Sequence, residues 1–175
     1  MSSTVLSPEA IVTNRVFSAT IFPKPSYQEL HNIEHKHYRE PTRGFCAGIL
    51  RNCPGTILLF ATGKAVINKC KTVDDAERSI YKCAMRTNLL LSDLKLVNVV
   101  GTMKFNCKFK TDMLAKTIPG AIFEPELHCG LLFYVNSVSV IVYHTGTVMF
   151  AGSKSDEEFE HVANVIRETL MPYGQ

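Results

Sequence analysis

Apolar residues along the chain form long and short runs. Longer segments rich in β-branched and aromatic residues, at 15–22 and 96–105, each precede a set of shorter apolar runs. Such runs, separated by turn sequences such as NCPG and ATGK, are typical of antiparallel strands joined by tight turns. The sequence therefore predicts two groups of strands, with the shorter ones at 45–51, 56–62 and 64–69 and at 129–135, 139–144 and 147–151.

Helices are predicted after each opening strand and at the end of each group. Ser26-Tyr-Gln-Glu29 is a capping-box sequence that begins a short helix, continued by Leu30 and Ile33. Residues 72–75 and 155–158 are two further capping boxes, whose acidic first turns suit the helix dipole. Apolar residues then recur at helical spacing, at Val73, Ala76, Ile80 and Cys83 and at Phe159, Val162, Ile166 and Leu170.

The two groups are copies of one unit. An offset of 83 residues brings FCAGIL onto HCGLLF, LLFATGK onto IVYHTGT and CKTVDDAE onto SKSDEEFE, and carries Val16 onto Val99. Glu40-Pro41 matches Glu124-Pro125 at an offset of 84, which requires one local slip. We therefore predict an N-terminal tail at residues 1–11 and two tandem repeats at 12–91 and 92–175.

Such a unit belongs to the α+β class and carries its helices on one face of a sheet. The predicted strands at 56–62 and 138–144 are apolar almost throughout, so both of their faces need cover. A flat, partly apolar partner or a second copy of the chain is expected on the face that lacks helices.

Positive charge is concentrated in the first half. Residues 1–90 contain 12 Lys and Arg against 7 Asp and Glu, whereas residues 91–175 contain 7 against 9. A polyanion is therefore expected to prefer the first half. The 6 cysteines form no C-x-x-C pair, which predicts reduced, mostly buried thiols and no zinc site. No leader or long apolar run is present, so we expect a soluble intracellular protein without a membrane partner.

Motifs for catalysis or for a cofactor are not found in the sequence. HNIEHKH places His31 and His35 four residues apart near Glu34 and His37, a spacing that could hold a metal; we interpret it as a solvated stretch of the first helix. There is no nucleophile elbow, P-loop or H-E-x-x-H. Paired acidic residues at 74–75 and 156–158 are explained by helix N-termini. We expect neither an enzyme nor a bound cofactor.

The tandem units resemble the conserved core of the TATA-box-binding protein family. The resemblance rests on LVNVVGTMKF, FEPELHCGLLF, LLFATGK and VIVYHTG, covers residues 12–173, and is more specific in the second half. It implies a saddle-shaped, ten-stranded antiparallel sheet with four helices on its convex face. It further implies a concave face that binds the minor groove of promoter DNA, in the nucleus or a viral transcription compartment.

The resemblance also implies site residues. Aromatic wedges, which unstack base steps and so bend the duplex, fall at Phe45, Phe60, His128 and Tyr143. The family has phenylalanine at all four positions. Polar readers of the groove fall at Arg15 (or Asn14, if the chain slips by one), Asn68, Asn98 and Ala151, of which Asn98 is the clean match. Apolar groove contacts fall at Phe17, Leu58, Val66, Val100, Ile141 and Met149, and phosphate-binding cations at Lys64 and Arg43. Thr147 replaces the basic residue that Lys64 keeps, and both hairpins lack a cation that the family places there.

A partner surface is implied at the loop that contains Pro125. There Glu124, Glu126 and Leu127 would receive a transcription factor IIB-like protein, and a IIA-like protein and a homodimer of the free chain are further expected partners. The alternative from a different functional class is a duplicated interaction module that has lost DNA binding and holds a protein or a second copy of itself. Phe45, Phe60, Lys64 and the basic first half favour DNA.

Overall fold

The computed structural model of the chain describes residues 7–33, 47–51 and 53–174. These residues form an α+β fold of four α-helices and eight antiparallel strands, in the hydrogen-bonded order β2-β3-β4-β1-β5-β8-β7-β6. The α+β class is confirmed. Two compact units divide the chain: an N-terminal unit, Asn14–Val97, and a C-terminal unit, Asn98–Gln175 together with Met1–Thr13.

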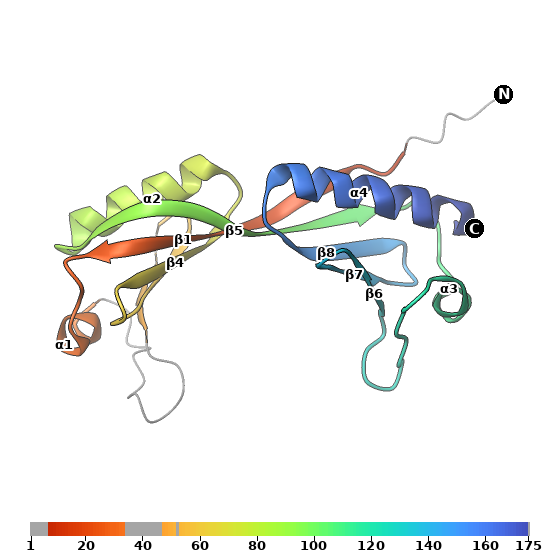
Figure 1. Ribbon diagram of the computed structural model, residues 1–175, viewed down its shortest axis with the longest axis horizontal. Helices are drawn as coiled ribbons and strands as arrows, with labels where there is room; N and C mark the ends of the chain where they lie inside the picture. The colour runs from red at the N-terminus through yellow and green to blue at the C-terminus, as the bar shows by residue number, and fades with distance from the viewer. Residues whose placement is uncertain (1–6, 34–46, 52, 175) are drawn as a thin grey trace. The chain divides into compact units, whose positions relative to one another are not determined.

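The N-terminal unit contains most of β1 (Ala10–Phe22) and the first part of β5 (Leu90–Lys104). Between them lie α1 (Tyr27–His31), β2 (Gly48–Leu50), β3 (Thr56–Leu59), β4 (Lys64–Cys70) and α2 (Val73–Arg86). Strands β2, β3, β4 and β1 pair in that order, and α2 runs along one face of them (Figure 1).

The C-terminal unit repeats this order of elements. After β5 come α3 (Thr111–Thr117), β6 (Leu131–Val135), β7 (Val138–Val142), β8 (Thr147–Ser153), α4 (Asp156–Leu170) and a 3-10 turn, η2 (Met171–Tyr173). β6, β8 and α4 begin 83 residues after β2, β4 and α2, whereas α3 begins 84 residues after α1. β5 runs continuously through residues 91 and 92, so the predicted repeat boundary there stays a prediction.

The strands of the described residues are fewer than the ten expected from the resemblance. Eight strands are found among the described residues, and Ile122 pairs with Leu132 only as an isolated bridge, with N···O distances of 2.7 and 2.9 Å. A single bridged residue stands there in place of a strand. The count of ten and the saddle outline remain predictions.

Alternate residues of β3, β7 and β8 are buried. Ile57 and Leu59 of β3 are fully buried, and so are Val138, Val140 and Val142 of β7. In the C-terminal unit the rings of Phe150 on β8 and Phe159 on α4 stack with centroids 4.7 Å apart. One face of these strands is therefore covered in each unit, and their intervening side chains are half-buried or exposed on the other face.

The core of the two units is filled by different side chains at corresponding places. In the N-terminal unit Phe17 of β1 and Ala76 of α2 are both buried in one hydrophobic cluster. In the C-terminal unit a Cβ on Gly101 would lie 2.3 Å from the ring of Phe159, so the glycine is required for that ring to fit. The large ring comes from the strand in one unit and from the helix in the other.

All three predicted N-caps are present. Ser26 and Glu29 form both bonds of a capping box, as do Thr72 and Asp75. At α4 the Ser155 hydroxyl accepts from the amide of Glu158, but the Glu158 carboxylate accepts from the amide of Lys154, at 2.7 Å, and not from the N-cap residue. Val73, predicted on the buried face of α2, is instead 48% exposed, because it is the first helical residue.

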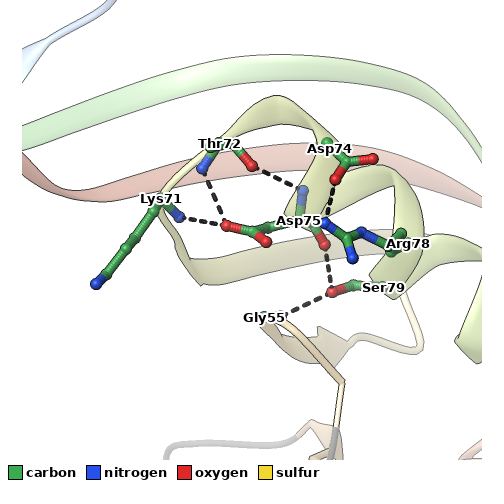
Figure 2. Close-up of polar contacts among 7 residues, drawn as sticks. All are labelled: Gly55, Lys71, Thr72, Asp74, Asp75, Arg78 and Ser79. Atoms are coloured by element: carbon green, nitrogen blue, oxygen red, sulfur yellow. Dashed lines mark hydrogen bonds and ion pairs between the residues drawn. The ribbon is translucent and has the colours of Figure 1, made fainter.

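The start of α2 is tied to the sheet through a connected set of hydrogen bonds (Figure 2). The Asp75 carboxylate accepts from the amides of Lys71 (2.9 Å) and Thr72 (3.1 Å), and these bonds hold the pKa of that carboxyl below its usual value. The buried Ser79 hydroxyl donates to the carbonyl of Asp75 and accepts from the amide of Gly55, which anchors the loop before β3.

The Asp75 cap predicts a pH dependence of stability. Because the folded pKa lies below the ordinary value of 3.8, the stabilisation is fully present above that pH and is lost as pH falls through the folded pKa. Asp75→Asn should therefore flatten the acid limb of the free energy of unfolding, measured with denaturant across pH. Thr72→Ala should cost about 1 kcal/mol. Asp74→Asn is the control, since it removes a carboxylate from the same first turn, and its exposed ion pair with Arg78, without touching the amides of Lys71 and Thr72; an equally flattened limb there would contradict the assignment.

Cysteines in the described residues are free thiols, as predicted, but the prediction that they are mostly buried is wrong for this part of the chain. Cys70 and Cys83 are buried, Cys53 and Cys107 are half-buried, and Cys129 is exposed. Burial raises the pKa of Cys70 to about 11, with a further contribution from the nearby Asp75. Cys70 therefore stays protonated at neutral pH. Among the described helices, none is long and apolar enough to span a bilayer.

Candidate nucleic-acid interface

Each unit has an open face, defined as the side chains of its strands that point away from the buried core. Six positions on this face correspond between the units, at an offset of 84 on β1 and β5 and of 83 elsewhere. They combine amides, hydroxyls and medium-sized apolar groups. The members are Asn14, Val16, Ser18, Leu58, Val66 and Asn68 in the N-terminal unit, and Asn98, Val100, Thr102, Ile141, Met149 and Ala151 in the C-terminal unit.

The strand register corrects the sequence alignment of the opening strands. Phe17 pairs with Ile67 and Gly101 pairs with Phe150. Since Ile67 and Phe150 correspond, Phe17 corresponds to Gly101, one residue away from the predicted match. A slip of one residue moves every side chain of a strand to the opposite face.

Two predicted groove residues are displaced by this slip. Phe17 is 2% exposed and lies in the core, contrary to the prediction that it contacts the groove. Arg15 pairs with Cys70, as Val99 pairs with Ser153, and its guanidinium donates to the carbonyl of Lys71.

Asn14, the alternative for a slip of one, is therefore the counterpart of Asn98. One match in the sequence at an offset of 84, Glu40-Pro41 with Glu124-Pro125, points to it, and the starts of α1 and α3 lie at the same offset.

Three carboxamides lie on the open faces. The side-chain oxygen of Asn98 accepts from the amide of Gly152 at 3.0 Å, which leaves its NH₂ group as the outward donor. The side-chain oxygens of Asn14 and Asn68 are buried and have no hydrogen-bond partner within the described residues. A buried acceptor without a partner costs roughly 1–3 kcal/mol, which marks both positions as candidate ligand contacts.

Apolar side chains pair across the open face between β3 and β4 and between β7 and β8. Leu58 pairs with Val66 and Ile141 pairs with Met149, at corresponding registers. All four are half-buried or, for Met149, 38% exposed. Val100 pairs with Ala151 beside the second pair. Each unit therefore presents an apolar strip next to its carboxamides.

Two of the predicted wedges occupy identical turns. The amide of Phe60 donates to the carbonyl of Lys64 at 2.9 Å, and the amide of Gly63 donates to the carbonyl of Phe60 at 3.0 Å. In the other unit Tyr143 donates to Thr147 and Gly146 donates to Tyr143 in the same way, at the same distances. The rings of His128 and Tyr143 lie 5.9 Å apart, so the structure brings the predicted C-terminal wedge pair together. Phe45 lies outside the described residues.

The acidic loop is a compact turn. The amides of Leu127 and His128 both donate to the carbonyl of Glu124 at 2.9 Å. Glu124 and Glu126 are exposed, and Leu127 is 82% exposed. The Nδ1 atom of His128 accepts from the amide of Gly130 at 3.0 Å, which fixes the ring above the start of β6.

The remaining predicted residues are placed as follows. Lys64 is exposed at the start of β4, and Arg43 lies outside the described residues. His31 ends α1, so the helix is shorter than predicted, and Glu34, His35 and His37 lie outside the described residues. No group of three or more His, Cys, Asp or Glu side chains that could hold a metal is found in the part of the chain that the structure describes.

The C-terminal half of the chain is similar to a known protein family. Residues 93–173 match the family described as Transcription factor TFIID (or TATA-binding protein, TBP). The TATA-box-binding protein of Pyrococcus furiosus is 28% identical over 127 residues, which are 67% of this chain and 66% of the relative. The match thus spans slightly less than two thirds of that relative's length.

A relative from a second organism aligns over most of the chain. The TATA-box-binding protein of Methanocaldococcus jannaschii is 25% identical over 176 residues, 95% of this chain and 96% of the relative. The solved structure of Methanococcus jannaschii TBP superposes with a TM-score of 0.80 at 24% identity, covering 94% of this chain and 99% of that chain. The structural likeness establishes the shared fold.

Proposed function

This chain is a divergent member of the TATA-box-binding protein family, and we propose that it acts as a transcription initiation factor that binds promoter DNA in the minor groove. The proposal includes bending of the duplex by aromatic wedges and action where transcription takes place, in the nucleus or a viral transcription compartment. The observation that carries it is the set of six corresponding open-face positions, since a surface repeated in two units suits the two strands of a duplex.

The chemistry of the open faces supports minor-groove contact. A·T pairs present only acceptors there, adenine N3 and thymine O2, which the outward NH₂ group of Asn98 can meet. The apolar pairs Leu58–Val66 and Ile141–Met149 offer flat contact to sugars and base edges. Phe60 and Tyr143 stand at turns at the end of these strands, where an inserted ring can unstack a base step.

A gel-shift experiment tests this function. The whole protein is titrated against A·T-rich and G·C-rich duplexes at two salt concentrations, and tighter binding to the A·T-rich duplex is expected. Met149→Glu should weaken binding at least about tenfold, because a carboxylate would be desolvated against DNA. Met171→Glu on η2 is the matched control, since Met171 is also exposed but lies off the sheet. No shift with either duplex would contradict DNA binding and favour a protein or a second copy of the chain on the open faces.

Phosphate attachment in the N-terminal unit is proposed to use Lys64 and Arg43. Replacing one of them by glutamine should lower the slope of log K against log salt by about 0.9, because each phosphate contact releases counterions. Binding measured across a salt series gives this slope. An unchanged slope for Lys64→Gln would place the DNA elsewhere.

The acidic turn is proposed to bind a basic surface of a transcription factor IIB-like protein. Reversal of Glu124 and Glu126 to lysine should abolish capture in a pull-down, because two exposed carboxylates beside Leu127 lose their attraction for that surface. Reversal of Glu160 and Glu168, exposed on α4, is the control with equal change in charge. Equal capture by both variants would remove the assignment. A IIA-like partner and a homodimer of the free chain belong to the same proposal and can be followed by sedimentation.

A further inference from the structure

The first residues of β4 and β8 each pair with a residue of the neighbouring strand. Both pairs consist of one lysine and one threonine, but the two residue types have exchanged strands. In the N-terminal unit Thr20 of β1 pairs with Lys64 of β4. In the C-terminal unit Lys104 of β5 pairs with Thr147 of β8. Thr20 corresponds to Lys104 at the offset of 84 found for the opening strands, and Lys64 corresponds to Thr147 at 83. The basic residue that is missing at Thr147 is thus supplied by the neighbouring strand.

The ammonium of Lys104 is held over the turn that carries Tyr143. Its Nζ donates to the carbonyl of Thr145 at 2.6 Å and to the hydroxyl of Thr147 at 3.1 Å. An ammonium has three N–H donors, so one remains for another acceptor. The side chain is exposed and lies on the same side of β5 as Val100 and Thr102, which is the open face.

We propose that Lys104 is a phosphate-binding residue for duplex DNA, filling in the C-terminal unit the role of Lys64 in the N-terminal unit. The inference rests on the proposed function. A lysine ammonium is a compact charge suited to a phosphate oxygen. Its two bonds to Thr145 and Thr147 hold that charge at the turn that follows Tyr143 before DNA arrives, which lowers the entropy lost on binding. The sequence comparison at an offset of 83 compares Lys64 with Thr147 and Thr20 with Met103, so it misses the exchange.

Lys104→Gln tests this assignment, because glutamine keeps N–H donors for the turn and removes the charge. On an A·T-rich duplex the salt slope should fall by about 0.9, so that the rise in Kd between about 50 and 200 mM salt becomes about 3.5-fold smaller. Lys104→Arg should retain the slope of the unchanged chain. Lys116→Gln, which removes an exposed lysine at the end of α3, is the matched control and should leave the slope unchanged.

An exchange variant separates a phosphate contact from a brace of the turn. Lys104→Thr combined with Thr147→Lys copies the pair of the N-terminal unit, and it should restore the slope that Lys104→Gln loses. If Lys104→Gln lowers thermal stability but leaves the slope of DNA binding unchanged, Lys104 is only a brace and the inference is overturned. Failure of the unchanged chain to bind any duplex would instead overturn the proposed function together with this inference.

Discussion

Gly146→Ala should destabilise the C-terminal unit by about 3 kcal/mol or more, whereas Gly63→Ala should cost about 1–2 kcal/mol. The two glycines occupy the same place in corresponding turns and have nearly the same φ, +84° and +87°. A Cβ on Gly146 would lie 2.3 Å from the carbonyl oxygen of Cys107 and 2.5 Å from that of Phe105. A Cβ on Gly63 would meet only the flexible side chain of Lys24, at 3.6 Å.

The difference between the two variants in the free energy of unfolding measures the cost of the steric clash at Gly146. Both carry the cost of a left-handed alanine, but only Gly146→Ala also displaces backbone and breaks the bond from the Phe105 amide to the Gly146 carbonyl, now 2.9 Å. Denaturant unfolding of each variant, followed by the fluorescence of the tyrosines, measures the difference. Equal losses would mean that the chain around Cys107 relaxes, and that the conformational cost alone decides stability at both turns.

Truncating Phe45 and Phe60 together to alanine should abolish DNA bending, and His128→Ala should cost much less. Unstacking a base step costs a few kcal/mol, so the wedge with the lowest desolvation cost dominates the bend. Phe60 is a purely apolar ring on the more basic half of the chain. His128 has a smaller ring with polar nitrogens, which lose hydration on insertion. Its Nδ1 also accepts a hydrogen bond from the amide of Gly130, which restricts how the ring can move. Tyr143 carries a hydroxyl that requires a partner.

Fluorescence transfer between the ends of a short labelled duplex measures the bend. Tyr81→Ala is the control, because Tyr81 is a large exposed ring on α2 and not on the open face. Similar losses from the Phe45/Phe60 and His128 variants would show that the two units wedge alike. Absence of bending by the unchanged chain, despite binding, would remove the wedges from the proposed function.

Local sequence signals predicted the elements well and the register of one strand poorly. The starts of α1, α2 and α4 follow from Ser26, Thr72 and Ser155, because a capping hydroxyl and a nearby carboxylate act within four residues. The turns at Gly63 and Gly146 follow from glycines that adopt positive φ. These features depend on residues that are close together in the sequence, so they can be recognised without knowledge of the tertiary structure.

The face on which β1 places its side chains depends on pairing with a distant strand. The stretch from Asn14 to Phe17 has no alternation of polar and apolar residues, so its pattern fits either face. Pairing of Phe17 with Ile67, after a shift in register between Arg15 and Phe17, fixes the choice. Arg15 and Phe17 were therefore predicted on the wrong side, while the residues of β3, β4, β7 and β8 lie on the predicted face. The proposed role of Lys104 likewise depends on its pairing with Thr147 of β8, which the sequence alone does not reveal.

The exchange of ring and small residue between Phe17–Ala76 and Gly101–Phe159 limits how the halves can be recombined. A chimaera that takes the strand of one half and the helix of the other receives either two rings for one space or none. Neither partner can change alone without a clash or a cavity, so each pair is inherited as a block. A recombination between the halves that separates the members of a pair would therefore destabilise the core.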